Sequence, residues 1–194
     1  MSLHCSNDRD MNWAEQIRND DKAAFSNLFV AYYTPLCEYA FRYVSRVEVM
    51  EDIVQEVFVR IWEQRKCWEP RVAVRAYLYR SVYHQVINDY RKKRFETSFK
   101  EDSESLIPEK GESPLDRLHN RETSRAIYEA IELLPARRKE ILVLRLLHGL
   151  SYKEIGAILD ISVNTVDTQI RRALKMLRVK LKHYSYNMKT RRAD

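Results

Sequence analysis

Residues 150–172 read LSYKEIGAILDISVNTVDTQIRR and carry the signals of two short helices separated by a turn. Ser151 and Glu154 form a capping box, in which each side chain bonds to the backbone N–H of the other residue at the start of a helix. The apolar face expected for this first helix consists of Ile155, Ile158 and Leu159. Gly156 has no side chain that would hold another helix at a distance. The segment therefore predicts a short helix with a fixed start.

The turn Asp160-Ile161-Ser162 leads into the second helix, which Ser162 is placed to cap. This helix is expected to bury Val163, Val166, Ile170 and Leu174 and to expose Asn164, Thr165, Asp167, Thr168, Arg171 and Arg172. Asn and Arg side chains read base edges, whereas Thr more often contacts phosphates. Two short helices arranged in this way are typical of a helix-turn-helix whose second helix enters the major groove of duplex DNA.

The charge of the chain agrees with a polyanionic partner. The 194 residues carry a formal net charge of +6, and residues 170–194 contain nine Lys or Arg against one acidic residue. A helical hairpin whose basic face only meets solvent is the alternative interpretation. We favour the DNA-binding helix-turn-helix because two helix caps and the basic charge coincide in one segment.

The rest of the sequence also favours helices. Only three glycines and five prolines occur, and long runs are rich in Leu, Ile, Arg, Glu and Ala. Asp20 or Asp21 is placed to cap the first N-terminal helix, and Cys67-Trp68-Glu69-Pro70 breaks helical order further on. Apolar spacing predicts helices over residues 20–43, with a restart at Thr34-Pro35, over 48–66, and from about 72 to 94.

Composition divides the chain into two modules. Residues 95–113 have few apolar side chains and an excess of acidic ones, which predicts a flexible acidic linker. We expect an all-α fold with two small helical domains, an N-terminal helical bundle over residues 20–94 and a C-terminal helix-turn-helix domain over residues 114–184. The C-terminal domain should open with a helix that ends before Pro135, and residues 185–194 should form a basic tail.

Two polar stripes lie on the predicted N-terminal helices. On helix 48–66, the side opposite the apolar face carries Asp52, Gln55, Glu56 and Val59. On the following helix, an outward stripe carries Arg80, His84, Asn88 and Arg91 and continues into the basic run 91–94. Charged stripes on helices usually face water, so a solvated surface is the simplest interpretation of the stripe on helix 48–66 taken alone.

The sequence offers little to an enzyme or a metalloprotein. Cys5, Cys37 and Cys67 are an odd number at wide spacing, and the five histidines are scattered. No glycine-rich phosphate loop or nucleophile elbow is present. We therefore predict no catalytic residues, no metal and no cofactor. A signal peptide and a membrane-spanning apolar run are also missing, which predicts a cytoplasmic protein without membrane insertion.

Both modules resemble one protein family, the extracytoplasmic function (ECF) sigma factors of bacterial RNA polymerase, which belong to the sigma-70 family. The resemblance to the family's C-terminal promoter-binding domain rests on Leu134-Pro135, residues 149–155, residues 161–166 and Arg172-Ala173-Leu174. The resemblance to its N-terminal domain rests on residues 51–58 (EDIVQEVF), Trp62 and Tyr77-Leu78-Tyr79-Arg80. The two matches lie in the family's order and cover most of residues 21–184.

The resemblance implies a sigma factor that directs promoter-specific initiation and helps to open the duplex. The clamp helices of the largest subunit of core RNA polymerase would bind Asp52, Gln55, Glu56 and Val59. The minus-ten element of the promoter would contact Trp68, Tyr77, Arg80, His84, Asn88, Arg91 and Lys92. The loop 64–71 would capture an unstacked base of the non-template single strand, with Trp68 or Tyr77 as the stacking partner. The minus-thirty-five duplex would contact Asn164, Thr165, Thr168, Arg171 and Arg172.

An anti-sigma factor is a further partner that the resemblance implies, and some residues depart from the family's pattern. His84 stands where the family usually has Asn, and Asp167 and Gln169 stand where it often has basic residues. Asp167 repels phosphate, so these departures bear on which promoter sequence is read. The alternative function is a stand-alone helix-turn-helix transcription regulator with an N-terminal sensing or dimerising domain. That alternative leaves the two N-terminal stripes and the loop 64–71 without a shared purpose.

Overall fold

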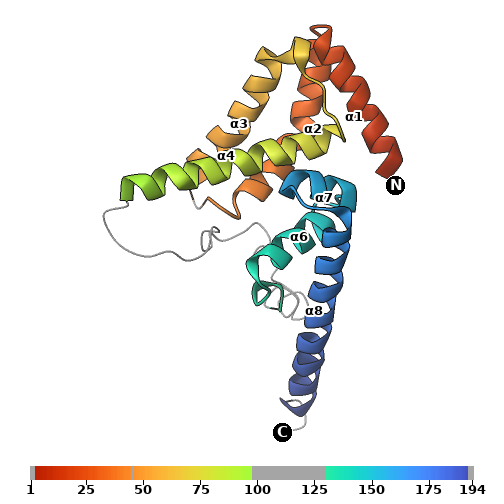
Figure 1. Ribbon diagram of the computed structural model, residues 1–194, viewed down its shortest axis with the longest axis vertical. Coiled ribbons are helices and arrows are strands. Elements are labelled where there is room, and N and C mark those ends of the chain that lie inside the picture. The colour runs from red at the N-terminus through yellow and green to blue at the C-terminus, as the bar shows by residue number, and fades with distance from the viewer. Residues whose placement is uncertain (1–2, 45, 98–129, 192–194) are drawn as a thin grey trace. The chain divides into compact units, whose positions relative to one another are not determined.

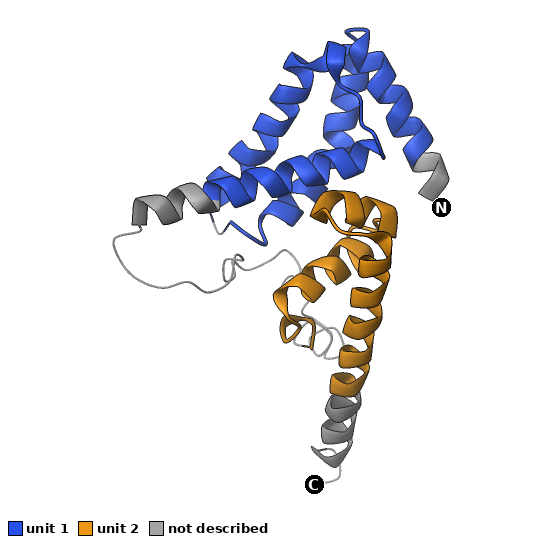
Figure 2. Cartoon of the chain, in the orientation of Figure 1, with its two compact units in different colours: residues 1–113 blue, residues 114–194 orange. Residues whose placement is uncertain are grey.

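The computed structural model describes residues 3–44, 46–97 and 130–191, and the side chains within 7–44, 46–89 and 130–181. All regular structure in these ranges is helical, which confirms the predicted all-α fold (Figure 1). The chain divides into two compact units, residues 1–113 and residues 114–194 (Figure 2).

The described part of unit 1 is a bundle of four helices and a short 3-10 helix. Its elements are α1 (Leu3–Arg18), α2 (Lys22–Ala40), α3 (Val47–Glu63), η1 (Arg65–Cys67) and α4 (Val74–Thr97). Helix α2 contacts each of the other three helices, so it forms the centre of the bundle. The largest fully buried side chains of the unit are Ile17, Leu28, Leu36, Tyr39, Phe58, Ile61 and Leu78. Burial of apolar side chains from all four helices provides the main driving force for this packing.

Helix α1 is an element that the sequence did not predict, because the N-terminal domain was expected to begin at residue 20. It packs against α2 and α4 and contributes Ala14 and Ile17, both fully buried, to the core. Asp10, only 1% exposed, also faces inward. Its carboxylate accepts a hydrogen bond from the Tyr32 hydroxyl and a bond of 3.0 Å from Arg9. Burial and this bond to Asp10 raise the pKa of Tyr32.

The predicted restart of the helix at Thr34-Pro35 is wrong, because α2 runs without a break through Pro35. Proline lacks an N–H and crowds the preceding turn, which normally ends or kinks a helix. Leu36 and Tyr39 follow directly and are fully buried, so tertiary packing outweighs the local penalty here. At the start of α2, Asp21 is the cap, and its carboxylate accepts bonds from the backbone N–H groups of Ala23 and Ala24.

The later helices of unit 1 differ from their predicted bounds by a few residues. Helix α3 ends at Glu63 instead of residue 66, and η1 takes up the next turn. Helix α4 begins at Val74 and continues to Thr97, so it extends past the predicted start of the linker at residue 95. The remainder of that linker lies outside the described residues.

Unit 2 contains α6 (Ala136–Leu146), α7 (Tyr152–Leu159) and α8 (Val163–Arg191). The helix predicted before Pro135 is described only at its end, residues 130–132, and its predicted start at residue 114 lies outside the described residues. Helices α6 and α7 both pack against α8. Helix α8 is continuous past residue 184, so the predicted basic tail begins as part of this helix.

The buried face of α8 only partly matches its prediction. Val166 and Ile170 are buried as expected, but Val163 and Leu174 are 47% and 48% exposed. Ala173 and Leu177 take their place in the core, together with Leu142 and Val143 of α6 and three residues just before it, Ala130, Ile131 and Leu134. The buried side of α8 runs along Val166, Ile170, Ala173 and Leu177. Val163 and Leu174 lie at the edge of this side.

Candidate nucleic-acid interface

The helix-turn-helix begins with the predicted capping box. The backbone N–H of Glu154 donates to Ser151 Oγ over 3.3 Å, and the N–H of Ser151 donates to Glu154 Oε2 over 2.8 Å. Gly149, with φ at 63°, is left-handed and lies between the end of α6 at Leu146 and the capping box. Ser162 caps α8, because its Oγ accepts a bond of 3.0 Å from the N–H of Thr165. These contacts confirm the predicted caps of both helices.

The turn between α7 and α8 is unusually close to the first helix. Asp160 ends α7 in the left-handed conformation with φ at 54°, and the chain then reverses direction. A Cβ atom added to Gly156 would lie 2.7 Å from the carbonyl oxygen of Ile161. Gly156 was expected to permit the approach of a helix, whereas the structure shows that it permits the approach of the turn itself.

Two arginines of helix α6 donate hydrogen bonds to backbone carbonyls of the helix-turn-helix. Arg137 forms an ion pair of 3.1 Å with the buried Glu140 and donates a bond of 2.8 Å to the carbonyl of Leu159, at the end of α7. Arg145 donates over 3.0 Å to the carbonyl of Leu150, just before the capping box. Both ends of α7 are therefore tied to α6.

The free face of α8 presents the predicted minus-thirty-five residues to solvent. All of them are exposed: Asn164, Thr165, Thr168, Arg171 and Arg172. Asp167 forms an ion pair of 2.9 Å with Arg171 Nε, and Arg171 remains 79% exposed. Gln169 accepts a bond of 3.1 Å from Arg138 Nε of α6, so it is part of the packing. Asp167 and Gln169, which both depart from the family's pattern, thus have different contacts: Asp167 orients Arg171, and Gln169 joins α8 to α6.

Helix α3 presents the predicted polymerase-binding stripe on its outer side. Asp52, Gln55, Glu56 and Val59 are all exposed, and they lie on one face at helical spacing. Glu56 forms an exposed ion pair of 2.8 Å with Arg60 one turn later. The Val59 side chain is 52% exposed among these polar groups, a position at which burial by a partner would be favourable.

Helix α4 brings three of the predicted minus-ten residues together on one exposed stripe, Arg80, His84 and Asn88. Arg80 Nε donates to His84 Nε2 over 3.3 Å, a bond that requires this ring nitrogen to be unprotonated. The side chain of His84 is exposed to solvent, so it does not pack in the core. Arg91 and Lys92 lie on the same helix, but their side chains are outside the described residues.

The loop after η1 contains the clearest correction. The side chain of Trp68 is 4% exposed and packs edge-on against the Tyr77 ring, with the centroids 5.7 Å apart. A base has no access to the face of a ring buried in this way, so the predicted stacking on Trp68 is wrong in this conformation. Tyr77 is half-buried, whereas the neighbouring Gln64, Lys66 and Cys67 are exposed. Because Trp68 lies in a predicted loop, it was interpreted as a contact with a base, but its side chain is part of the hydrophobic core.

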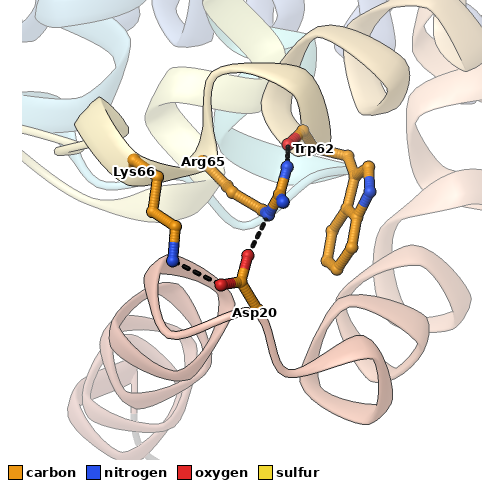
Figure 3. Close-up of polar contacts among 4 residues, drawn as sticks. All are labelled: Asp20, Trp62, Arg65 and Lys66. Atoms are coloured by element: carbon orange, nitrogen blue, oxygen red, sulfur yellow. Dashed lines mark hydrogen bonds and ion pairs between the residues drawn. The ribbon is translucent and has the colours of Figure 1, made fainter.

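Sequence reasoning also missed a contact across unit 1 (Figure 3). The carboxylate of Asp20, between α1 and α2, forms ion pairs with Arg65 and Lys66 of η1. These two cations lower the pKa of Asp20, the hydrogen bond from Lys66 being the largest cause. Asp20 and Arg65 lie 45 residues apart. Asp20 was considered only as a possible helix cap, and no local signal indicates a partner at that distance.

The described residues contain no group of three or more His, Cys, Asp or Glu side chains that is able to hold a metal ion. Within the same part of the chain, no helix has the length and apolar character needed to cross a membrane. The candidate surfaces are the exposed stripes of α3 and α4 and the loop with η1 in unit 1, and the exposed face of α8 in unit 2.

Comparison with known protein families matches both units. The model described as Sigma-70 region 2 covers residues 28–96, which include most of α2, all of α3 and most of α4 with both exposed stripes. The model described as Sigma-70, region 4 covers residues 124–177, which include α6, α7 and the first half of α8 with its exposed residues Asn164 to Arg172.

Individual relatives match most of the chain. The ECF RNA polymerase sigma factor SigW of Bacillus subtilis is 30% identical over 178 residues, or 87% of this chain and 94% of that protein. The ECF RNA polymerase sigma-E factor of Haemophilus influenzae is 30% identical over 175 residues, 86% of this chain and 92% of the relative. The solved structure of CnrH in complex with the cytosolic domain of CnrY shares the fold, with a TM-score of 0.62 and 23% identity over 90% of this chain and 98% of that one. The chain therefore belongs to the ECF family of RNA polymerase sigma factors.

Proposed function

We propose that the chain directs promoter-specific transcription by binding core RNA polymerase through α3, the minus-ten element through α4 and η1, and the minus-thirty-five element through α8. The order of the region 2 and region 4 matches, each over a unit with an exposed polar surface, is the observation that carries this proposal. As a sigma factor, the chain acts by binding and positioning in the cytoplasm, and its function calls for no catalytic group of its own.

Residues of the α3 stripe are the proposed contact with the clamp helices of the largest polymerase subunit. Asp52, Gln55 and Glu56 offer carboxylate and amide groups to basic partners, and the exposed Val59 adds an apolar contact in their midst. A solvated stripe has no need of an exposed valine, whereas a protein interface gains free energy by burying it.

The α4 stripe and the loop 64–71 are the proposed contacts with the minus-ten element. Arg80 and His84 are joined by their hydrogen bond and lie in line with Asn88, so cationic and amide groups follow one track along the helix. Such a track suits a single strand, because cations bind the phosphates and amides bind base edges. Arg91, Lys92 and Tyr77 extend the proposed surface, and we assign the unstacked base of the non-template strand to the exposed part of the loop.

The exposed face of α8 is the proposed reader of the minus-thirty-five duplex. Asp167 binds Arg171 through Nε, which leaves both terminal nitrogens of the guanidinium for O6 and N7 of a guanine. Asn164, Thr165, Thr168 and Arg172 supply the remaining donors and acceptors on the same face. Specificity at one guanine then depends on the carboxylate that orients the arginine.

Replacing Asp167 with alanine should separate orientation from simple charge. Loss of one negative charge should raise affinity for unrelated duplex DNA, while loss of the oriented Arg171 should reduce discrimination for the promoter by about tenfold. Binding of the full chain to promoter and unrelated duplexes, measured at several salt concentrations, provides the readout. The control Lys175→Gln removes an exposed charge from the same helix and should weaken both complexes equally. An equal gain on both duplexes for Asp167→Ala would show that the carboxylate acts only through its charge.

An anti-sigma factor is a further proposed partner. The solved structures of CnrH with the cytosolic domain of CnrY, and of RpoE with the anti-sigma factor NepR from Bartonella quintana, contain sigma-type folds bound to a second protein. A stand-alone transcription regulator is the competing function, and it is not favoured because it gives no role to the region 2 match over residues 28–96.

Opening of promoter DNA tests the proposed division of labour. With Arg80→Ala and Asn88→Ala combined, we expect the full chain to bind core polymerase and the minus-thirty-five duplex normally. Unpaired thymines in the minus-ten element, detected by permanganate, should fall by about tenfold or more because both groups contact the separated strand. Normal opening by this variant would refute the assignment of strand separation to α4.

A further inference from the structure

The corner between α1 and α2 adopts a backbone conformation that its residue does not favour. Asp20 has φ at 68°, in the left-handed region that glycine enters freely and other residues enter at a cost. Aspartate tolerates this region better than most side chains, but a glycine here would carry no strain at all. A strained residue that persists at a surface corner suggests that its side chain has a task.

The side chain of Asp20 reaches across to η1 (Figure 3). One carboxylate oxygen accepts a bond of 2.5 Å from Arg65 Nε, and the other pairs with Lys66. Arg65 in turn donates over 2.7 Å to the carbonyl of Trp62, and its guanidinium lies 4.5 Å above the Trp62 ring. That ring packs on Phe25 of α2, so the contact is anchored in the bundle at both ends.

A second tie joins the end of α1 to the same loop. Arg18, the last residue of α1, donates over 3.2 Å to the carbonyl of Trp68. Arg18 and Asp20 thus hold the segment on both sides of its exposed residues Lys66 and Cys67. Single exposed ion pairs contribute little to stability, but several fixed points on one short loop restrict its conformations.

We propose that the end of α1 is a brace for the base-capturing loop, and that Asp20 is the positioning residue that sets this loop for the extruded base. This inference rests on the proposed role of the loop 64–71 in strand separation. Capture of an unstacked base requires the loop to be in place beforehand, because ordering it during capture would subtract from the binding free energy. Helix α1, which packs on the bundle, then has a second task at the promoter.

The test combines Asp20 variants with promoters that lack one base. Asp20→Gly removes the carboxylate and also the backbone strain. Release of strain stabilises the fold, whereas glycine adds entropy to the unfolded chain and two exposed ion pairs are lost, so the free energy of unfolding should stay close to that of the wild type. The matched control is Asp160→Gly, which releases the same kind of strain at the other described non-glycine residue with positive φ. A double variant, Arg65→Gln with Lys66→Gln, removes the contact from the opposite side. Each full chain is assembled with core polymerase, and open-complex formation is measured on a mapped promoter and on versions with single abasic sites in the non-template minus-ten strand.

We expect the effect of the Asp20 variants on the rate of open-complex formation to depend on the presence of one base. For the wild type, one abasic site should slow open-complex formation by about tenfold, as expected for loss of a stacked base. Asp20→Gly and the double variant should slow opening of the intact promoter by about fivefold, because a misplaced loop loses part of the contact with the base. The abasic site that slows the wild type should reduce the opening rate of these variants little further. Asp160 lies in the helix-turn-helix, so this control is judged by its pattern of losses. Each abasic site should slow Asp160→Gly by the same factor as the wild type, measured relative to the rate of that variant on the intact promoter.

Four results would overturn the inference. Opening at the wild-type rate by Asp20→Gly would show that the brace is not needed, and equal fractional losses at every abasic site would place the effect of Asp20 elsewhere. A wild-type protein indifferent to all abasic sites would refute base capture by the loop and the brace with it, while initiation itself would still support the proposed function. Failure of the wild-type protein to support any initiation would overturn both.

Discussion

Replacing Gly156 with alanine is expected to weaken binding of the minus-thirty-five duplex strongly. The added Cβ would lie 2.7 Å from the backbone carbonyl of Ile161, and a backbone atom is unable to move aside as a flexible side chain does. The turn must therefore open, which tilts α8 relative to α7. Overpacking of this kind costs about 1–3 kcal/mol of folding free energy. We expect a similar fall in the free energy of unfolding, measured with urea, and a loss of promoter-duplex binding by at least about tenfold.

The matched control for this change is Gly149→Ala. A Cβ at Gly149 meets no atom within 4 Å, but φ at 63° makes the substitution strained. It should cost about 1–2 kcal/mol through the backbone alone and leave the arrangement of α7 and α8 intact. The two variants should lose a comparable free energy of unfolding, but only Gly149→Ala should bind DNA normally. This result would establish the geometric role of Gly156. Full promoter binding by Gly156→Ala would contradict it.

The double substitution Asp52→Arg with Gln55→Ala is expected to break the association with core RNA polymerase. Both side chains are exposed on the outer face of α3, so the fold should be unaffected. Reversing a charge within an electrostatically complementary interface costs several kcal/mol, which corresponds to an affinity loss of about a hundredfold or more. Co-purification with core polymerase and a binding titration give the measurement. The melting temperature and the minus-thirty-five duplex affinity of the variant should remain those of the wild type.

Glu15→Arg with Gln16→Ala provides a control of the same composition. These residues are exposed on α1, which carries none of the proposed polymerase contacts. The control should bind core polymerase normally. Equal retention of core polymerase by the α3 variant would remove α3 from the interface and leave the stripe as a solvated surface.

The parts of this structure that were predictable from the sequence are those fixed by local chemistry. The capping box at Ser151 and Glu154 and the cap at Ser162 depend on neighbours within a few residues, and each occurs where it was predicted. Periodicity also placed the exposed stripes of α3 and α4, because a wide apolar face on one side of a helix defines its polar side.

The features that escaped prediction depend on residues far apart in the sequence. Helix α1 has only a narrow apolar face and buries the charged Asp10, which is acceptable because Tyr32 of α2 supplies a hydrogen bond. Trp68 gave a binding signal and became core because Tyr77 packs against it. Composition and spacing carry no information on such pairings, which are decided when the helices pack.

The central claim, that this chain directs initiation by RNA polymerase, is tested most directly by single-round run-off transcription. Start sites that appear when the protein is overproduced identify a promoter, which is then transcribed by core polymerase with and without the purified full chain. We expect a transcript from the mapped start only when the protein is present, and its loss with Asp52→Arg and Gln55→Ala combined. Tight binding to the duplex together with equal transcript levels in the presence and absence of the protein would contradict the claim and indicate an ordinary DNA-binding regulator.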